Sequence, residues 1–426
     1  MPGIAQEPHG GRMSGLFRTR LRRAAVDTRP LRTPAYRRLL LGQGVSFIGF
    51  QLTAVAVSAQ VYAITGSSLW VGLLGPANLI PLVVFGLWGG AVADAVERRR
   101  LLIIGSLVAW SASLALLAHA WSGLGNVYFI LAAVAVQSTG FAVTSPVRYA
   151  IIPRLLPTEQ VAAANTLNFL AGSIGTVAGP LLAGVVLARG GYATAYLLDA
   201  LLFAAVLYAA VRLPRLAPLG DIARPGLRSV ADGLRYIAGR PIVMMSFVVD
   251  IIAMAFAMPR ALYPELTADR FGGSPVAFGW LSASLAIGSV AAGLFSGWVG
   301  RVRRQGAGLV VVIALWGLTV AAAGVAGPLW LVVALLAAGG AFDLVSAVWR
   351  QTILQTYAPD EMRGRLQGVF MVVVAGGPRL GDLRAGATAG AFGLVPAWAG
   401  GGLICAVLVL AAGLAVPAFR RYQATG

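Results

Sequence analysis

The chain is 426 residues long, 58% hydrophobic and only 11% charged, so it cannot cover a water-soluble surface, for which about 25% charged residues are usual. Its formal net charge of +18 comes entirely from arginine, in short clusters between apolar runs, which is typical of cytoplasmic loops and argues against a nucleic-acid-binding protein. One cysteine, Cys405, excludes an internal disulfide, and the distant His9 and His119 leave no cysteine–histidine metal cluster to expect.

The start of the chain and the apolar runs after it define the expected layout. Residues 1–38 hold nine arginines and no apolar core, which predicts a basic cytoplasmic arm attracted to anionic inner-leaflet lipids, not a secretory signal. Because about 20 mostly apolar residues cross a bilayer, the runs that follow predict twelve membrane-spanning helices. Their approximate ranges are 39–64, 69–92, 101–120, 127–148, 161–188, 192–212, 242–264, 275–299, 307–326, 329–354, 366–392 and 397–418.

The longest polar stretch, 213–241, separates the sixth apolar run from the seventh. We therefore expect an all-α membrane protein with a six-helix bundle at 39–212, a second at 242–418 and a cytoplasmic tail at 419–426. After a proline-rich start, the linker carries apolar residues at helical spacing, which predicts an amphipathic helix in the cytoplasmic membrane interface or, equally, a soluble linker helix. The residues of that apolar face are Leu227, Val230, Leu234 and Ile237.

The expected loops alternate in charge along the chain. Every second loop carries arginines, and the loops between them are short and almost uncharged, namely 65–68, 121–126 and 326–328. The positive-inside rule then places both termini in the cytoplasm of a multi-pass cell-membrane protein. Little of the chain remains outside the membrane, which argues against a receptor with an extracellular domain.

The two halves of the chain carry traces of an internal repeat. SPVRYAIIPRLLPTEQ at 145–160 aligns with AVWRQTILQTYAPDEM at 347–362, so that Arg148 meets Arg350. Both segments close the fourth expected helix of their half, which predicts pseudo-symmetric bundles. Repeated halves around a midplane site are the usual construction of secondary transporters.

A short stretch between the second and third expected helices is the most specific motif. Residues 89–101, GGAVADAVERRRL, resemble the signature loop of the major facilitator superfamily, which is glycine, three residues, aspartate, arginine and a basic cluster. The sequence departs from that pattern at Ala95, which replaces the arginine, and at Glu97, which replaces the common glycine. Further blocks resemble the siderophore (enterobactin) exporter branch over nearly all of 36–420, among them SPVRYAIIPRLLP, GLRYIAGRP and PDEMRGRLQGV.

This resemblance implies a function as well as a fold. It implies a proton-coupled secondary transporter that exports a siderophore-like small organic molecule by alternating access. A multidrug or macrolide-type efflux antiporter is the alternative, and import of a nutrient comes third. Such blocks mainly record shared architecture, so the substrate is not read from any residue.

The implied architecture sets the signature loop against the start of the eleventh helix, across the two halves. We therefore expect Asp94 to face the N-terminal end of that helix, whose partial positive charge favours an anion. Ion pairs between the halves would then hold the cytoplasmic side closed in the outward-facing state, unless the arginines only mark topology. The expected gating residues are Asp94, Arg98, Arg99 and Arg100 with Asp360 and Glu361, and in the mirrored contact Arg301, Arg303 and Arg304 with Glu159.

Two aspartates, Asp250 and Asp343, lie inside the expected seventh and tenth helices. In the implied architecture these helices and the first and fourth line the central cavity. A carboxylate in a low-dielectric cavity can bind and release a proton near neutral pH, so both are proton-coupling candidates. The alternative is a structural salt bridge to Arg148 or Arg350.

Other polar residues in the apolar runs are candidates for the cavity or for buried charge. Asp382 lies three residues from Arg379 and two from Arg384, which predicts local neutralisation of Arg379 and one arginine left for a partner or an anionic substrate. Asp199 is expected to be structural. Cavity candidates, for each of which helix packing is the alternative, are Ser46, Gln51, Gln137, Thr144, Phe256 and Trp349.

Other function classes find little support. Without lysine the chain cannot contain a GxxxxGK[ST] phosphate-binding loop, and it has no HExxH or GxSxG motif, so we expect neither an enzyme nor a cofactor. The two-half layout favours alternating access over a channel. The expected partners are a small organic substrate, protons and the lipid bilayer, and the expected state is a monomer.

Overall fold

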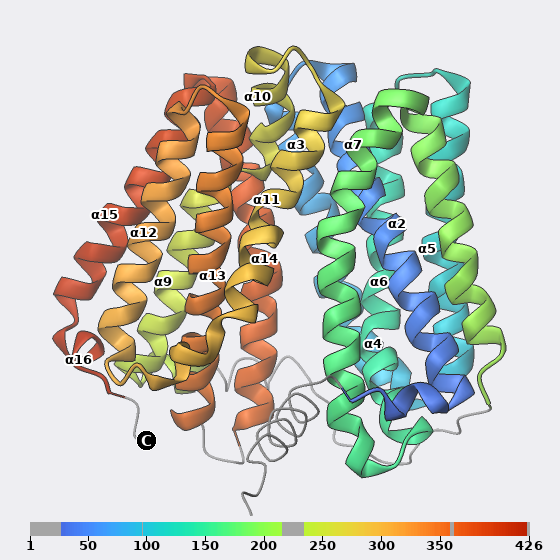
Figure 1. The fold of residues 1–426 in the computed structure, drawn as a ribbon, viewed down its shortest axis with the longest axis horizontal. Coiled ribbons are helices and arrows are strands. Elements are labelled where there is room, and N and C mark those ends of the chain that lie inside the picture. Colours follow the sequence, from blue (N-terminus) through green and yellow to red (C-terminus); the bar gives the residue numbers. More distant parts are fainter. Residues whose placement is uncertain (1–26, 96, 215–233, 358–361, 424–426) are drawn as a thin grey trace, which may run out of the picture.

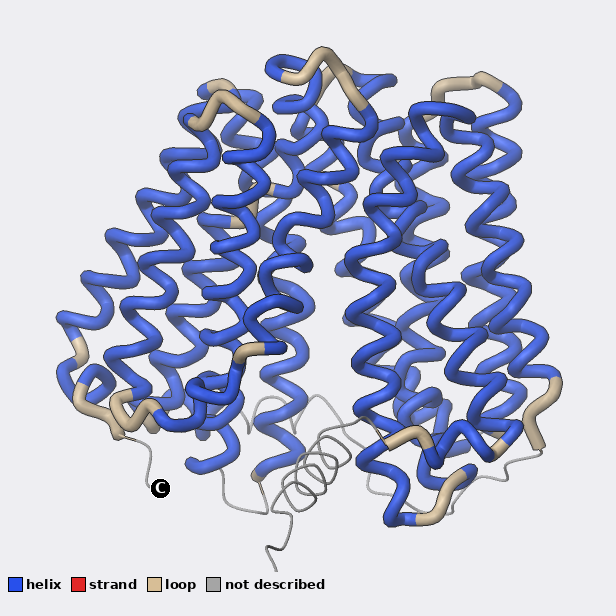
Figure 2. The backbone as a smooth tube through the Cα atoms, viewed as in Figure 1, coloured by secondary structure: helices blue, strands red, loops and turns tan. Residues whose placement is uncertain are grey.

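The computed structural model of the protein describes residues 27–95, 97–214, 234–357 and 362–423. Within these ranges the chain forms helices joined by short loops and contains no strand (Figure 2). Figure 1 shows two helix bundles side by side, the N-terminal one in blue and green and the C-terminal one in yellow to red. The expectation of an all-α membrane fold made of two bundles is confirmed.

The N-terminal bundle begins after a short 3-10 helix, η1 (Arg29–Arg32). Glycines and an asparagine side chain mark several helix ends: Gly66 and Gly123 have positive φ angles, and Asn126 accepts hydrogen bonds from the backbone N–H groups of Tyr128 and Phe129. The helices of this bundle are α2 (Pro34–Thr65), α3 (Ser68–Gly72), α4 (Leu74–Ala95), α5 (Arg98–Ser122), α6 (Val127–Leu155) and α7 (Thr158–Val211).

The C-terminal bundle repeats this plan with one broken helix. The run expected at 242–264 ends as a regular helix at Ala257 and resumes after a turn, because Pro259 and Pro264 have no N–H to donate. The elements are α9 (Pro241–Ala257), η2 (Arg260–Leu262), α10 (Tyr263–Arg270), α11 (Pro275–Leu294), η3 (Ser296–Arg301), α12 (Gln305–Val325), α13 (Leu329–Tyr357), α14 (Arg363–Phe392), η4 (Pro396–Gly400), α15 (Gly401–Ala415) and α16 (Pro417–Arg420).

The number of membrane crossings follows from helix length and composition. Ten helices in the described ranges are long and apolar enough to cross a bilayer. One of them, α7, is 54 residues long and breaks at Gly191 (φ 67°, ψ −168°), so it is long enough to cross twice. Helix α14 is not one of the ten, but with 30 residues it is long enough for a further crossing. Together these make the expected twelve.

The bundles have two faces, which we name by their loops. The arginine-rich face carries the helix ends at Arg98, Arg154, Arg240 and Arg301, and the opposite face carries loops 66–67, 123–126, 271–274 and 326–328. In Figure 1 the C-terminus lies at the lower, arginine-rich end, and α3 and α10 lie at the upper end. An even number of crossings brings both ends of the described chain to the same face.

The bundles meet through small residues in the half nearer the opposite face. A Cβ atom added to Gly184 of α7 would lie 2.8 Å from the Pro275 carbonyl oxygen of α11, and one added to Gly279 would lie 2.8 Å from the Pro180 carbonyl oxygen. A second seam joins α3 and α4 to α14, where Cβ atoms on Gly75 and Gly386 would meet backbone carbonyls across the seam. Such close backbone approach requires glycine.

A side-chain hydrogen bond also joins the two bundles near the opposite face. The Ser68 hydroxyl of α3 donates a hydrogen bond to the Glu265 carboxylate of α10, which belongs to the other bundle. The two bundles are therefore held together at this end by backbone packing and by one charge-assisted hydrogen bond.

The linker between the bundles is described only in part. Leu227 and Val230 lie outside the described residues, and the chain is helical again at 234–238. Ile237 is buried against Val243, Leu354 and Leu366 at the arginine-rich ends of α9, α13 and α14, whereas Leu234 is exposed. At Ile237 the predicted apolar face therefore packs on protein.

Candidate substrate cavity and buried charges

The arginine-rich half of the N-terminal bundle contains two adjoining cavities that share Phe47, Phe141 and Arg148. The larger, of about 260 Å³, lies between α2, α6 and the first part of α7, and is lined on α7 by Asn168 and Gly172. The smaller, of about 30 Å³, extends into the bundle toward α5 and the second part of α7. Three expected cavity residues line it: Ser46, Gln137 and Thr144.

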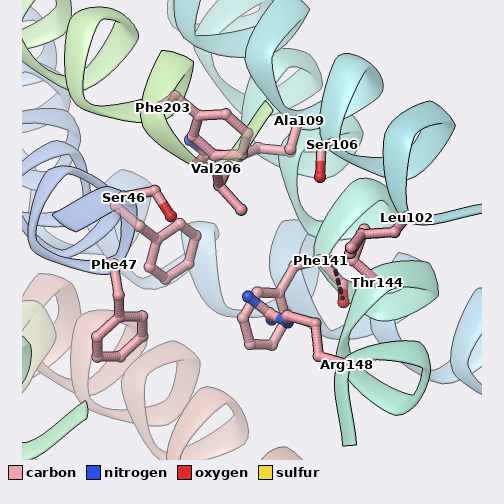
Figure 3. Close-up of a pocket in the computed structure, with 12 residues that line it drawn as sticks. Ser46, Phe47, Leu102, Ser106, Ala109, Phe141, Thr144, Arg148, Phe203 and Val206 are labelled. Atoms are coloured by element: carbon pink, nitrogen blue, oxygen red, sulfur yellow. Dashed lines mark hydrogen bonds between the residues drawn. The ribbon is translucent and has the colours of Figure 1, made fainter. Parts of the chain in front are cut away.

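Arg148 is the charged group that lines both cavities, and it lies at the end of a row of stacked phenylalanine rings. Its guanidinium carbon lies 5.2 Å from the centre of the Phe141 ring, within the range of a cation–π interaction. Phe50 stacks on Phe141 at 5.6 Å and on Phe47 at 6.1 Å. Figure 3 shows the guanidinium beside the Phe141 ring, with Phe47 and Ser46 across the cavity.

Among the described residues no acid lies within 4 Å of Arg148 as an ion-pair partner. A cation in a membrane protein interior is costly unless something compensates it. Here the compensation is the face of the Phe141 ring. The arrangement therefore leaves the hydrogen-bond donors of the guanidinium available to a ligand with acceptor oxygens.

The two expected proton-coupling aspartates lie together in the C-terminal bundle, on one arginine. Arg350 of α13 pairs with Asp250 of α9, and its other terminal nitrogen lies 3.8 Å from Asp343 of α13. The side chains of Arg350 and Asp250 are 5% and 3% exposed, whereas the Asp343 side chain is 38% exposed. Of the two arginines expected as salt-bridge partners, Arg350 contacts these aspartates in this structure and Arg148 does not.

The charges of α14 are arranged differently from the prediction. The expected pair of Asp382 with Arg379 is not formed: no ion pair within 4 Å joins them in the described chain, and Arg379 donates to the Ala375 carbonyl one turn earlier. Arg384 donates to the carbonyls of Ala255 and Phe256, at 2.9 and 2.5 Å. These are carbonyls that the break after Ala257 leaves without helical partners, so Arg384 caps the end of α9.

The remaining cavity candidates pack between helices. The Trp349 indole N–H donates to the Val299 carbonyl at 2.9 Å, and the side chain is 3% exposed. Gln51 packs against Gly179 of α7, and the Phe256 ring lies under Arg384. None of the three lines the cavities described above.

The expected gating residues at the arginine-rich face are described only in part. The side chain of Asp94, together with Asp360 and Glu361, lies outside the described residues. Arg98 and Arg99 donate to the carbonyls of Ala150 and Val211, and Arg100 pairs with Glu97, so in this structure all three contact their own bundle. The mirrored set is exposed and shows no ion pair in the described chain: Glu159, Arg301, Arg303 and Arg304.

The structure also reveals polar contacts that sequence reasoning missed. Asp199 of α7 is fully buried and accepts a hydrogen bond from Ser113 of α5 at 2.7 Å. Gln137 of α6 in turn donates to Ser113 at 3.3 Å. An isolated acid in an apolar run was the only available signal, since nothing local in the sequence links these three helices.

Comparisons with known proteins agree with this architecture. The sequence profile of a family described as transmembrane secretion effector matches residues 25–424. Enterobactin exporters of Shigella boydii serotype 18 and of Escherichia coli O1:K1 are 29% identical, over 92% of this chain and 94% of theirs.

Solved structures show the same fold at lower identity. The nucleoside transporter NupG superposes with a TM-score of 0.72 at 14% identity, covering 91% of this chain and 99% of its own. A bacterial homologue of the human lysosomal transporter Spinster, described as inward-facing and unoccupied, gives a TM-score of 0.69 at 16% identity, with coverage of 92% and 97%. At these identities the likeness speaks for the fold alone.

Proposed function

The chain belongs to the transmembrane secretion effector family of the major facilitator superfamily, and from this premise we propose that it exports a siderophore-like small organic molecule in exchange for protons. It is a membrane transporter and not an enzyme. The enterobactin exporters, which match over most of both chains, support the direction and the substrate class.

The observation that carries this proposal is the aromatic cavity around Arg148. A cation held against the Phe141 ring, at the end of a row of stacked phenylalanines, suits an amphipathic molecule with rings and acceptor oxygens. Such rings stack on the aromatic side chains, and the oxygens accept hydrogen bonds from the guanidinium. An uncharged or cationic multidrug substrate would use the rings and gain nothing from the arginine. The alternative, a multidrug or macrolide-type antiporter, therefore predicts weak dependence on Arg148.

In an alternating-access mechanism, this structure corresponds to one of the conformational states of the transporter. If the arginine-rich face is cytoplasmic, as the positive-inside rule requires, both termini are cytoplasmic and the bundles are closed toward the outside. The structure then represents the inward-open form, in which the cavity receives substrate from the cell. We further propose that the protein works as a monomer and that arm 1–38 interacts with anionic inner-leaflet lipids.

Proton coupling is assigned to the cluster of Asp250, Asp343 and Arg350. One arginine shared by two carboxylates leaves a net negative charge, and binding one proton removes it. Asp343 is the more exposed acid and the more distant from the guanidinium, so it is the group that would take the proton. Once Asp343 is protonated, Arg350 would form an ion pair with Asp250 alone.

Replacing Arg148 by alanine is expected to weaken substrate binding about 10- to 100-fold, since a hydrogen bond to a charged group contributes about 1.5–3 kcal/mol. Lysine should restore part of this, because it keeps the charge without the planar fork. Binding to purified protein measures the effect, with the exposed Arg154→Ala on the same helix as control. Equal affinity in Arg148→Ala and the control would favour the multidrug alternative.

The Asp94 gate remains a prediction with its own test. Asp94→Asn should reduce transport several-fold at normal amounts of protein in the membrane, because the favourable interaction of a carboxylate with a helix N-terminus is lost. Uptake of substrate into inside-out vesicles, normalised to the amount of transporter, measures this. Normal transport by Asp94→Asn would leave the arginines as topology markers only.

The function itself is tested by transport. A deletion strain should accumulate a catecholate siderophore inside the cell, and purified protein in liposomes should exchange it for protons when a pH gradient is imposed. A channel would pass the compound without that gradient. Accumulation of cationic dyes instead of the siderophore would support multidrug efflux.

A further inference from the structure

Among the described residues of the N-terminal bundle, Asp199 is the buried acid, and it lies apart from the charges of the C-terminal bundle. Asp199 is 0% exposed, and no cation lies within 4 Å of it as an ion-pair partner in the described chain. One carboxyl oxygen, Oδ2, accepts the hydrogen bond from Ser113 at 2.7 Å. The other, Oδ1, is buried and has no hydrogen-bond partner.

The groups packed around Asp199 are neutral. From α2, Gly49 approaches so closely that an added Cβ atom would lie 2.5 Å from Oδ1, and the buried Thr53 lies one turn further along that helix. From α5 and α6 come Ser113 and Gln137. The titratable neighbour is Tyr196 of the same helix, whose hydroxyl donates to Gln60 at 2.6 Å.

This setting differs from that of the other buried acid. Asp250 has a guanidinium to balance its charge, whereas a charged Asp199 would have only hydroxyl groups. An uncompensated carboxylate in an apolar interior is strongly disfavoured, and binding a proton removes the charge. Burying a neutral carboxylic acid with one unpaired oxygen also costs less than burying an unpaired carboxylate oxygen.

Asp199 is connected to the substrate cavity. Gln137 lines the smaller cavity beside Arg148, and its side-chain amide donates to the Ser113 hydroxyl, which donates to Asp199. The three side chains come from α6, α5 and α7, so a shift of any of these helices changes the contact. A substrate that moves Gln137 would thus alter the hydrogen bonding of the buried acid.

We propose that Asp199 is a second proton-binding site, separate from the Asp250, Asp343 and Arg350 cluster, and connected to the cavity through Ser113 and Gln137. It holds a proton in the structure described here. When the contact between Ser113 and Gln137 opens to the cavity, the carboxylic acid transfers its proton to water, giving a carboxylate and a hydronium ion. The Ser113 hydroxyl remains as donor to the carboxylate. The proposal holds for any transported substrate.

Infrared spectroscopy of the purified, full-length protein without substrate tests this directly. The wild-type minus Asp199→Asn difference spectrum should contain the carbonyl-stretch band of one protonated carboxylic acid at neutral pH. The band should shift in heavy water and disappear as the pH is raised. Ser113→Ala should keep the band at a changed frequency, because the acid loses its hydroxyl partner.

Two results would overturn the site. One is a difference spectrum without a carboxylic-acid band, which would mean that Asp199 is ionised. The other is a band that neither shifts in heavy water nor titrates, which would make the acid a sealed structural group. Asp250→Asn, which should leave the band intact, is the control for general loss of packing. Because no substrate is present, failure here leaves the export proposal untouched.

Discussion

Arg350→Gln is expected to destabilise the folded protein by about 3–5 kcal/mol, because it leaves the Asp250 carboxylate buried without a cation. Both side chains lie in the interior of the C-terminal bundle, where water cannot replace the lost partner. The measurement is thermal unfolding in detergent, together with the amount of monodisperse protein recovered. Arg189→Gln, an exposed arginine at the opposite face, serves as the matched control.

The double variant separates charge from packing. Asp250→Asn combined with Arg350→Gln removes both charges and keeps similar volumes, so most of the lost stability should return. If Arg350→Gln unfolds at the same temperature as the Arg189→Gln control, the cluster does not balance a buried charge. In that case the assignment of proton coupling to Asp343 through Arg350 loses its basis.

Gly184→Leu is expected to open the bundles at the opposite face and to lower transport strongly. The added side chain would enter the backbone seam between α7 and α11, where even a Cβ atom lies 2.8 Å from a carbonyl oxygen. Overpacking typically costs about 1–3 kcal/mol, and a free energy of that size shifts a two-state equilibrium roughly 5- to 150-fold. The form described here, which contains this seam, should therefore lose population to the form that is open at the opposite face.

Distances between spin labels measure this shift. Leu124→Cys and Trp330→Cys place one exposed label in each bundle at the opposite face, in a background where Cys405, the only cysteine, is replaced by alanine. Gly184→Leu should increase the long-distance population. Gly390→Leu is the control, because an added Cβ atom there meets nothing within 4 Å. An unchanged distance distribution would show that the seam does not set the state.

The sequence determined that the chain lies in a lipid bilayer, how many times it crosses the bilayer and how the charged loops are arranged. Each depends on a local property, because about 20 apolar residues span a bilayer wherever they occur, and a positively charged loop is retained on the cytoplasmic side by its own charge. The break at Gly191 was also visible locally, as a glycine pair between two apolar runs. The signature loop could predict the family because its motif is also local, a short run of consecutive residues.

Tertiary structure alone decided which charges meet. Sequence offered Asp250 two possible arginines, and the packing of α9 against α13 within one bundle selected Arg350. Arg384 bonds to carbonyls freed by a helix break, and Asp199 bonds to Ser113 on another helix. Trp349 fills the bundle interior and does not line the cavity. Partners distant in sequence depend on helix rotation and register, which hydrophobic periodicity leaves undetermined in helices that are apolar on all sides.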